Sequence, residues 1–328
     1  MSSELPAALR SGLEALAASF PGRDLAAASA RLTADYRAGR GTRLPSPVDV
    51  AAYAIARMPA TYAACTHALA EASARADVMP RSILDIGAGP GTATWAASEA
   101  FPSIEAARLV DSHAGMTSVG KRLATYSSGV LSAAEWVSAD LAGLPSDVTA
   151  DLVIASYALN EAAIDKVPRI AADLFQRSTG LLVLVEPGSK AGFAVIAAAR
   201  SALVAAGGRI VAPCPSDGVC PMSEPDWCHF AERLPRLRAH KAAKGADVPF
   251  EDEPFSYLVV ARPGLVIRPA TARILKPPRA QKPGTSFSLC TPAGIATRFV
   301  AARDREAFRA TRRLGWGDAI PPDHGETP

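Results

Sequence analysis

The sequence predicts an α/β protein with a doubly wound parallel sheet. Between residues 78 and 262, short apolar runs alternate with segments of helical periodicity, which is typical of a parallel sheet covered by helices on both faces. A glycine loop follows the first apolar run, and beyond residue 262 the pattern changes to short segments punctuated by Pro and Gly. We therefore expect a helical region over 1–77, an α/β domain over 78–262, and a small β module with one helix over 263–328.

The N-terminal region is predicted to be helical. Residues 5–40 carry apolar side chains at three- and four-residue steps, namely Leu9, Leu13, Leu16 and Phe20, and this spacing places them on one helix face. A second helix is expected over 48–76, after the proline-containing segment 44–47.

Five apolar runs predict the parallel strands of the α/β domain. They cover residues 82–86, 107–111, 135–140, 151–155 and 181–185. Helices are expected after the glycine loop, over 164–175 and over 193–206, where the last helix ends at a Gly-Gly pair typical of a helix C-terminus. Runs at 209–212 and 256–260 then predict an antiparallel pair that closes the sheet.

The C-terminal β module is strongly basic. Its strands are expected at 265–268, 273–275, 286–289 and 295–300, followed by a helix around 304–314. Between Arg262 and Trp316 there are twelve Lys and Arg residues against two acids, whereas the whole chain has a net charge of only +3. A basic end of this kind predicts a polyanionic partner, and nucleic acid fits best.

Composition narrows the class of protein. No run of eighteen or more apolar residues lacks charges, so no contact with a membrane interior is expected. The first residues resemble neither a signal peptide nor an Arg-rich transit peptide, and we expect a cytoplasmic protein. In that reducing compartment, clustered cysteines are more often metal ligands or catalytic groups than disulfides.

The glycine loop Asp85-Ile86-Gly87-Ala88-Gly89-Pro90-Gly91 predicts a nucleotide-type cofactor. Its form, acid-x-Gly-x-Gly-x-Gly after a strand, resembles motif I of class I methyltransferases, which hold S-adenosylmethionine; dinucleotide binders more usually read G-x-G-x-x-G. Asp111 is placed to accept hydrogen bonds from ribose hydroxyls, and Asp140 to contact the adenine amino group. The expected cofactor-binding set is Asp85, Gly87, Ala88, Gly89, Gly91, Asp111, Asp140, Leu141 and Ser156.

A catalytic motif is missing after the fourth strand. Amino-methylating relatives place Asp/Asn-Pro-Pro-aromatic there, whereas this chain reads Ala155-Ser156-Tyr157-Ala158-Leu159-Asn160-Glu161. We therefore predict that the class I fold binds its cofactor, assign no catalytic residue, and keep an active methyltransferase as an alternative.

Four of the five cysteines lie in the C-terminal half, at Cys214, Cys220, Cys228 and Cys290. The first three, within an insertion at about 213–255, are separated by five and seven residues, gaps wider than those of compact zinc sites. Proline follows Cys214 and Cys220, as it often does after ligands of iron–sulphur clusters. Spacing alone leaves an iron–sulphur cluster, a zinc ion and unligated thiols open.

These segments together resemble the methyltransferase-like small-ribosomal-subunit assembly proteins of mitochondria and their bacterial counterparts. The resemblance rests on the glycine loop, the cysteine segments with Asp226-Trp227-Cys228-His229-Phe230, and the segments 57–62, 158–161, 186–189, 251–257 and 312–318. One departure is Ser216, where relatives commonly carry His.

The resemblance implies three properties. The first is a 4Fe-4S cluster on Cys214, Cys220, Cys228 and Cys290, with zinc as the alternative metal. The second is binding to small-subunit ribosomal RNA during ribosome assembly and translation. The third is a methyltransferase fold whose activity on ribosomal RNA is an open alternative. We accordingly expect a bacterial cytoplasmic protein that is monomeric when free.

Overall fold

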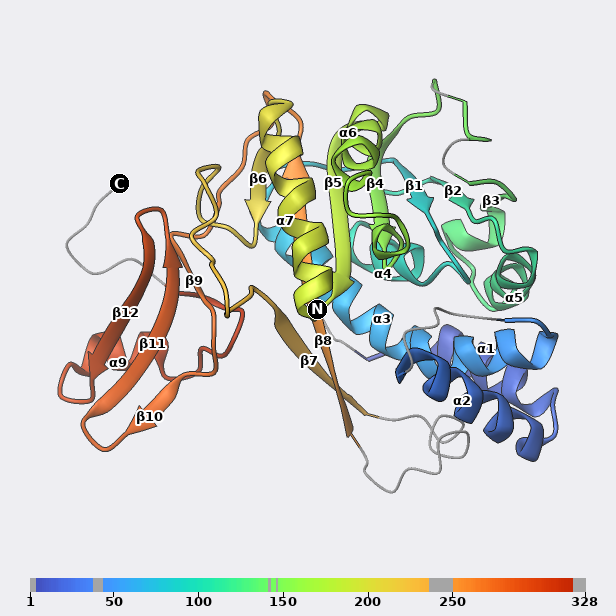
Figure 1. The fold of residues 1–328 in the computed structure, drawn as a ribbon, viewed down its shortest axis with the longest axis horizontal. Coiled ribbons are helices and arrows are strands. Elements are labelled where there is room, and N and C mark those ends of the chain that lie inside the picture. The colour runs from blue at the N-terminus through green and yellow to red at the C-terminus, as the bar shows by residue number, and fades with distance from the viewer. Residues whose placement is uncertain (1–3, 38–43, 141–142, 146, 236–249, 321–328) are drawn as a thin grey trace.

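The computed structural model describes residues 4–37, 44–140, 143–145, 147–235 and 250–320. Figure 1 shows a large α/β body beside a smaller sheet made by the C-terminal part of the chain. None of the helices in the described ranges is both long enough and apolar enough to span a bilayer.

Three N-terminal helices pack against the body. They are α1 (Ala7–Ala18), α2 (Gly22–Arg37) and α3 (Pro47–Arg75). The single helical stretch predicted over 5–40 is thus two helices, because Pro21 lies between them and disfavours helical backbone at the residue before it. Ser46 caps the N-terminus of α3, and its hydroxyl accepts a hydrogen bond from the Asp49 amide. Most of α3 is buried, so it forms part of the core.

The main sheet has the predicted doubly wound topology. Its strands are β1 (Ser82–Ile86), β2 (Ala106–Val110), β3 (Glu135–Val137), β4 (Ala150–Ser156), β5 (Ser178–Pro187), β6 (Arg209–Ala212), β7 (Phe230–Pro235) and β8 (Phe250–Ala261). The order is β3-β2-β1-β4-β5-β8-β6, with β7 paired to β8. Strands β1 to β5 run parallel, and β8 runs antiparallel to both β5 and β6. This is the class I methyltransferase arrangement, and the predicted fold class is confirmed.

Helices cover both faces of the main sheet. They are α4 (Thr92–Ala100), α5 (Ala114–Ala124), α6 (Val167–Arg177) and α7 (Lys190–Ala205), with short 3-10 turns η1 (Val130–Ala133) and η3 (Leu159–Glu161). Alternate residues of each strand enter two cores. Ile83 and Leu152 join the core under α3 and α4, whereas Leu84 and Val153 join the core under α6 and α7. Burial on both faces explains why these strands are apolar throughout.

The C-terminal part forms a second, antiparallel sheet. Its elements are β9 (Ala272–Ile274), β10 (Arg279–Gln281), β11 (Gly284–Thr291), β12 (Gly294–Ala301), α9 (Arg305–Thr311) and β13 (Ala319–Ile320). Phe308 of α9 packs against Phe287, Leu289 and Val300, so α9 covers one face of this sheet. The strand predicted at 265–268 is wrong: only Ile267 makes an isolated bridge, to Ala76. Prolines on either side of this segment remove backbone donors.

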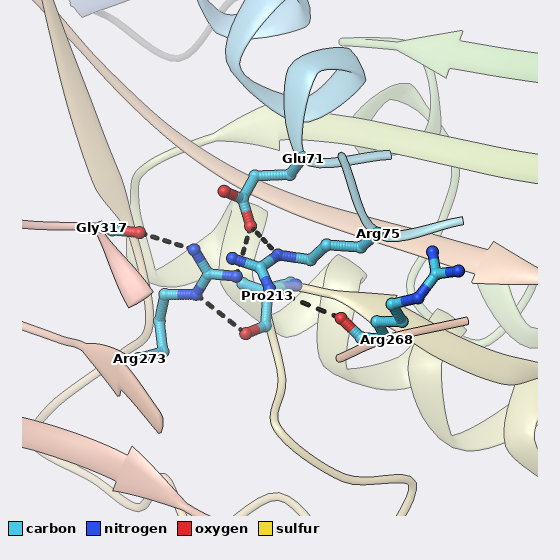
Figure 2. Close-up of polar contacts among 6 residues, drawn as sticks. All are labelled: Glu71, Arg75, Pro213, Arg268, Arg273 and Gly317. Carbon is cyan, nitrogen blue, oxygen red and sulfur yellow. Dashed lines mark hydrogen bonds and ion pairs between the residues drawn. The ribbon is translucent and has the colours of Figure 1, made fainter. Parts of the chain in front are cut away.

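One buried arginine joins the two sheets (Figure 2). Arg273 of β9 has only 1% of its surface exposed. Its Nε donates to the Pro213 carbonyl at 3.0 Å, one terminal nitrogen donates to the Gly317 carbonyl at 2.7 Å, and the other pairs with the carboxylate of Glu71. The contact therefore connects α3, the loop after β6, β9 and the segment before β13.

Glu71 shares its carboxylate with a second cation. The Nε of Arg75 donates to it at 2.6 Å, and the same guanidinium reaches the Arg268 carbonyl at 3.5 Å. Burial alone would raise the pKa of Glu71, but Arg273 and Arg75 outweigh it and lower the pKa. The carboxylate therefore stays ionised and compensates the buried cation of Arg273.

We expect Glu71→Gln to lower the free energy of unfolding by about 3 kcal/mol, because it leaves the Arg273 guanidinium buried without its counterion. Urea denaturation measures this change. The matched control is Glu105→Gln, which removes the exposed Arg81–Glu105 pair and should change stability by less than about 1 kcal/mol. Equal effects of the two variants would show that the buried pair does not hold the sheets together.

Candidate functional site

The glycine loop between β1 and α4 turns sharply beneath an open cleft. Gly87, Gly89 and Gly91 have φ angles of 65°, 53° and 84°, in the left-handed region that favours glycine. A Cβ atom on Gly87 would lie 2.6 Å from the Cβ of Ala158, so this position also needs glycine for close packing. A Cβ on Gly89 would meet nothing within 4 Å, so a ligand can approach the backbone there.

Acidic side chains that follow β2 and β3 accept hydrogen bonds from backbone amides beside the cleft. Asp111 accepts a hydrogen bond from the Gly89 amide at 2.7 Å and one from the His113 amide at 2.7 Å. Asp140 accepts one from the Gly143 amide at 2.8 Å. Both carboxylates line the cleft, where they retain lone pairs that could accept further hydrogen bonds.

The cleft has a volume of about 1080 Å³, which exceeds the range of an ordinary small-molecule site. Six residues of the predicted cofactor set lie on its wall: Gly87, Ala88, Gly89, Asp111, Asp140 and Ser156. Asp85 and Gly91 are not part of this wall. Leu141 lies outside the described residues.

Asp85 is fully buried near the loop. Its Oδ2 accepts a hydrogen bond from the Thr94 hydroxyl at 2.8 Å, whereas Oδ1 is buried without a partner among the described residues. Burial, together with the nearby charge of Asp111, raises the pKa of Asp85 to about 7. The carboxyl group is therefore poised to change its charge near neutral pH.

A polar network that the sequence analysis missed lies beside the loop. Tyr157, directly after β4, has a φ of 55°, which is unusual for a residue other than glycine. Its hydroxyl donates to Glu253 at 2.8 Å, and the Arg57 guanidinium donates to the same carboxylate at 2.9 Å and 3.3 Å. Burial, and next the charge of Glu253, raises the pKa of Tyr157 well above its ordinary value. The phenol therefore stays neutral and remains a hydrogen-bond donor to Glu253.

Further charged residues line the cleft. Glu161, Lys166 and Arg169 come from the segment between β4 and α6 and its first helical turn. Burial, with a contribution from the charge of Asp111, raises the pKa of Glu161. In the sequence analysis, this part of the site was indicated only by the family resemblance of segments 57–62, 158–161 and 251–257.

A second cavity, of about 170 Å³, is lined by all four C-terminal cysteines. Cys214 and Cys220 lie in the loop after β6, Cys228 precedes β7, and Cys290 lies on β11 of the second sheet. The cavity therefore lies where the α/β body meets the C-terminal sheet. None of these thiols forms a disulfide.

Two buried arginines share the wall of the cysteine cavity. Arg273 is paired with Cys290 in the register of β9 and β11. Arg200 of α7 donates to the carbonyls of Ser216 and Gly218, and its Nε is buried without a partner among the described residues. The cavity wall therefore carries positive charge and one unused donor.

Burial keeps three of the thiols protonated. It raises the pKa of Cys228 well above the ordinary value, and the neighbouring thiols raise it further. Burial followed by the same kind of repulsion raises the pKa of Cys290 to about 12. Burial also raises the pKa of Cys214, although Arg200 opposes the shift.

The cysteines surround a space and do not converge on one point. Within the described part of the chain, no three His, Cys, Asp or Glu side chains are grouped closely enough to hold a metal ion. The donor set is nevertheless suitable for an iron–sulphur cluster, since four thiols and two buried cations face one cavity. The residues present thus fit a group that is bound by thiolates.

Aromatic contacts fix the cysteine loop. The Trp227 indole nitrogen donates to the Gly188 carbonyl at 2.8 Å, and the Ser256 hydroxyl donates to the Cys228 carbonyl at 2.8 Å. The ring of His229 stacks on Trp227 at 4.9 Å and meets the ring of Trp316 edge-on at 4.8 Å. These contacts hold the Cys228 segment between the body and the second sheet.

A family model described as mitochondrial small ribosomal subunit Rsm22 matches residues 47–321. The chain belongs to the Rsm22 family. The match spans α3, the main sheet, the cysteine segments and the C-terminal sheet. The resemblance inferred from the motifs is thereby confirmed at the level of the family.

Curated relatives agree with this assignment. The human ribosome assembly protein METTL17, mitochondrial, is 27% identical over 290 residues, covering 82% of this chain and 62% of the relative. A Schizosaccharomyces pombe Rsm22-cox11 tandem protein, also mitochondrial, is 27% identical over 334 residues, covering 85% of this chain and 44% of the relative. The chain thus spans less than two thirds of the length of these relatives.

These comparisons contradict the expected bacterial cytoplasmic location. The family description and the names of the curated relatives all specify mitochondria. The expectation relied on the composition of the first few residues, which does not identify a compartment for an Rsm22 chain.

Solved methyltransferases resemble the structure weakly. Magnesium protoporphyrin IX methyltransferase from Synechocystis, with bound SAM, has a TM-score of 0.40 and 13% identity, covering 68% of this chain and 86% of that one. The plantazolicin methyltransferase BpumL has a TM-score of 0.39 and 12% identity, covering 77% and 99%.

We expect the stability of the protein relative to Asp85→Asn to depend on pH. The unfolded chain ionises Asp85 near pH 3.8, whereas the folded state keeps it protonated up to about pH 7. The wild type should therefore lose stability relative to the variant as the pH rises through this interval, by a few kcal/mol, and change little above it. Urea denaturation across the interval measures the difference.

Asp151→Asn provides a control of opposite sign. Burial opposes ionisation of Asp151, but hydrogen bonds led by the Arg81 amide lower its pKa. The advantage of the wild type over this variant should therefore shrink as the pH falls. A pH-independent difference for Asp85→Asn would contradict a raised pKa at that site.

Proposed function

We propose that this Rsm22-family chain binds small-subunit ribosomal RNA and assists assembly and translation by the small ribosomal subunit. In this proposal, S-adenosylmethionine occupies the glycine-loop cleft and a 4Fe-4S cluster occupies the cysteine cavity. The observation that carries it is the meeting of four cysteines from separate segments in one cavity between the body and the basic sheet. A cluster there would fix the orientation of the basic sheet.

The chemistry of the cavity supports a cluster more than zinc. Proline follows Cys214 and Cys220, as it often does after ligands of iron–sulphur clusters, and the gaps between Cys214, Cys220 and Cys228 are wider than those of compact zinc sites. A cluster bound by thiolates carries negative charge, which Arg273 and Arg200 would compensate. The unused Nε of Arg200 would then find an acceptor. When bound, the cluster crosslinks the loop after β6 to β11.

The cleft supports S-adenosylmethionine as its ligand. The backbone of Gly87 and Gly89 allows close approach, Asp111 would accept hydrogen bonds from the ribose hydroxyls, and Asp140 would contact the adenine amino group. Asp85 carries a buried oxygen without a partner near the loop. The cofactor would supply an activated methyl group.

Methyl transfer to ribosomal RNA is the second candidate function. The cleft volume of about 1080 Å³ favours it, because room for an acceptor would remain beside a cofactor. The residue directly after β4 argues against it. Tyr157 lies in the segment where amino-methylating enzymes carry the motif that holds the target nitrogen; this chain lacks that motif, and the Tyr157 hydroxyl is already bonded to Glu253. We therefore propose binding as the primary function.

The basic C-terminal sheet supports RNA as the partner. Twelve Lys and Arg residues lie between Arg262 and Trp316 against two acids, a distribution that favours phosphate contacts. The names of METTL17 and of the family, which refer to ribosome assembly and to the small ribosomal subunit, support the same partner.

Cys290→Ser should abolish the visible absorption of the anaerobically purified protein and its bound iron and sulphide, because the cavity loses the ligand from β11. It should also weaken binding to small-subunit RNA while leaving S-adenosylmethionine affinity unchanged. Cys65→Ser is the control, since Cys65 is a buried core thiol outside the cavity. If the wild-type protein contains stoichiometric zinc and no iron, the metal is zinc and the cluster is rejected. If Cys290→Ser binds RNA as tightly as the wild type, the crosslinking role of the cluster is rejected.

Gly89→Arg should abolish S-adenosylmethionine binding in calorimetry, because the new side chain would enter the cleft. Gly264→Arg is the matched control: its φ is also positive, at 92°, and its surroundings are also open. RNA affinity should remain unchanged in both variants. If wild-type protein transfers labelled methyl groups to small-subunit RNA and Gly89→Arg does not, the second candidate function replaces the first.

A further inference from the structure

Among the described residues, one face of the C-terminal sheet carries no helix over β10, β11 and β12. Helix α9 packs on the face that carries Phe287, Leu289 and Val300. Since neighbouring residues of a strand point to opposite faces, the alternate residues of β11 and β12 lie on the other face. Their register places Arg279, Ser286 and Phe299 in one row across β10, β11 and β12.

This open face combines an exposed aromatic ring with hydroxyls. Phe299 is 49% exposed, although it lies on a paired strand. A Cβ on Gly284 would lie 2.8 Å from the Phe299 ring, so the ring rests against the backbone of β11. Ser288 and Thr297 form the next pair along the same face. The face can therefore offer a ring for stacking beside groups that form hydrogen bonds.

The charge of this region has one sign. Residues 279–301, which hold β10, β11 and β12, contain three cations, Arg279, Lys282 and Arg298, and no Asp or Glu. Arg279 is exposed and lies in the same cross-strand row as Phe299. Arg298 is paired with Phe287 and lies on the face under α9, so Arg279 supplies the positive charge of this row. A stacking ring beside a cation and hydroxyls is the combination that binds unpaired nucleotides.

We propose that the face formed by Arg279, Ser286, Ser288, Thr297 and Phe299 binds an unpaired RNA segment, with one base stacked on Phe299 and a phosphate held by Arg279. The inference rests on the proposed RNA-binding function and specifies its contact surface and the type of RNA. A duplex fits this face less well, because its bases are stacked on one another and expose no ring face.

The face adjoins the cysteine cavity. Cys290 and Ile295 form the next cross-strand pair on the same face after Ser288 and Thr297, and both line the cavity. Arg273 is paired with Cys290 from the other side. An RNA strand that follows the sheet from Phe299 therefore approaches the edge of the cavity, and whatever fills the cavity supports one end of the binding face.

Fluorescence titration tests the proposal, with an unstructured RNA of roughly 12 nucleotides carrying 2-aminopurine, and with a duplex of the same sequence. Phe299→Leu should weaken binding to the single strand roughly tenfold and reduce the quenching that reports stacking. Phe299→Trp should retain both. The control is Phe250→Leu, which changes a phenylalanine of similar exposure (51%) outside this sheet.

Arg279→Ala should make the negative slope of log affinity against log salt shallower by about 0.7, because one phosphate contact to a single strand is lost. Arg305→Ala, on α9 and away from this face, is the matched control. If Arg305→Ala weakens RNA binding and Phe299→Leu does not, RNA binding stands but its assignment to this face is wrong. The assignment is also wrong if the wild-type protein binds the duplex more tightly than the single strand. Wild-type protein that binds neither RNA rejects the proposed function itself.

Discussion

The buried guanidinium of Arg273 is the contact on which the arrangement of the two sheets depends. A cation with 1% exposure is tolerated only if its charge and donors are all matched, and its partners come from α3, the loop after β6 and the segment before β13. Pro213 directly precedes Cys214, and Arg273 itself lies beside Cys290 in the β9–β11 pairing. The polar requirements of one side chain thus bring cysteines of the body and of the second sheet to the same cavity.

Strand β8 connects this cavity with the cofactor cleft. Glu253, in the half of β8 that pairs with β7, receives hydrogen bonds from Tyr157 and Arg57 at the cleft. Three residues further along, Ser256 holds the carbonyl of Cys228. The polar network of the cleft and the support of the cysteine loop therefore share one continuous strand that is also hydrogen-bonded to β5 and β6. This shared strand explains why a methyltransferase-type scaffold can carry a second centre without separate support.

Contacts that are local in sequence could be predicted, and those that join distant segments could not. The glycine loop and the apolar strands of the main sheet follow from short patterns, as does the antiparallel pairing of β6 with β8. The break at Pro21 between α1 and α2 was not predicted, although the apolar pattern used for residues 5–40 ends at Phe20. Strand β7 was missed because it is half polar and forms by pairing with β8. The Arg57–Glu253 contact spans 196 residues, and no pattern within either segment indicates it. That all four cysteines share a cavity could be expected only from the family resemblance.

The sequence separations within the Arg273 network also dictate an order of events during synthesis. Glu71 precedes Arg273 by 202 residues, and Gly317 follows it by 44. Because translation delivers the chain from its N-terminus, α3 and the parallel strands emerge while Glu71 still lacks the cation it faces in the finished protein. Domains generally fold as they emerge, yet the contacts of Arg273 are complete only once Gly317 has left the ribosome. A ribosome that stops before Arg273 would therefore yield a product that lacks the cation paired with Glu71 and the strands of the basic sheet.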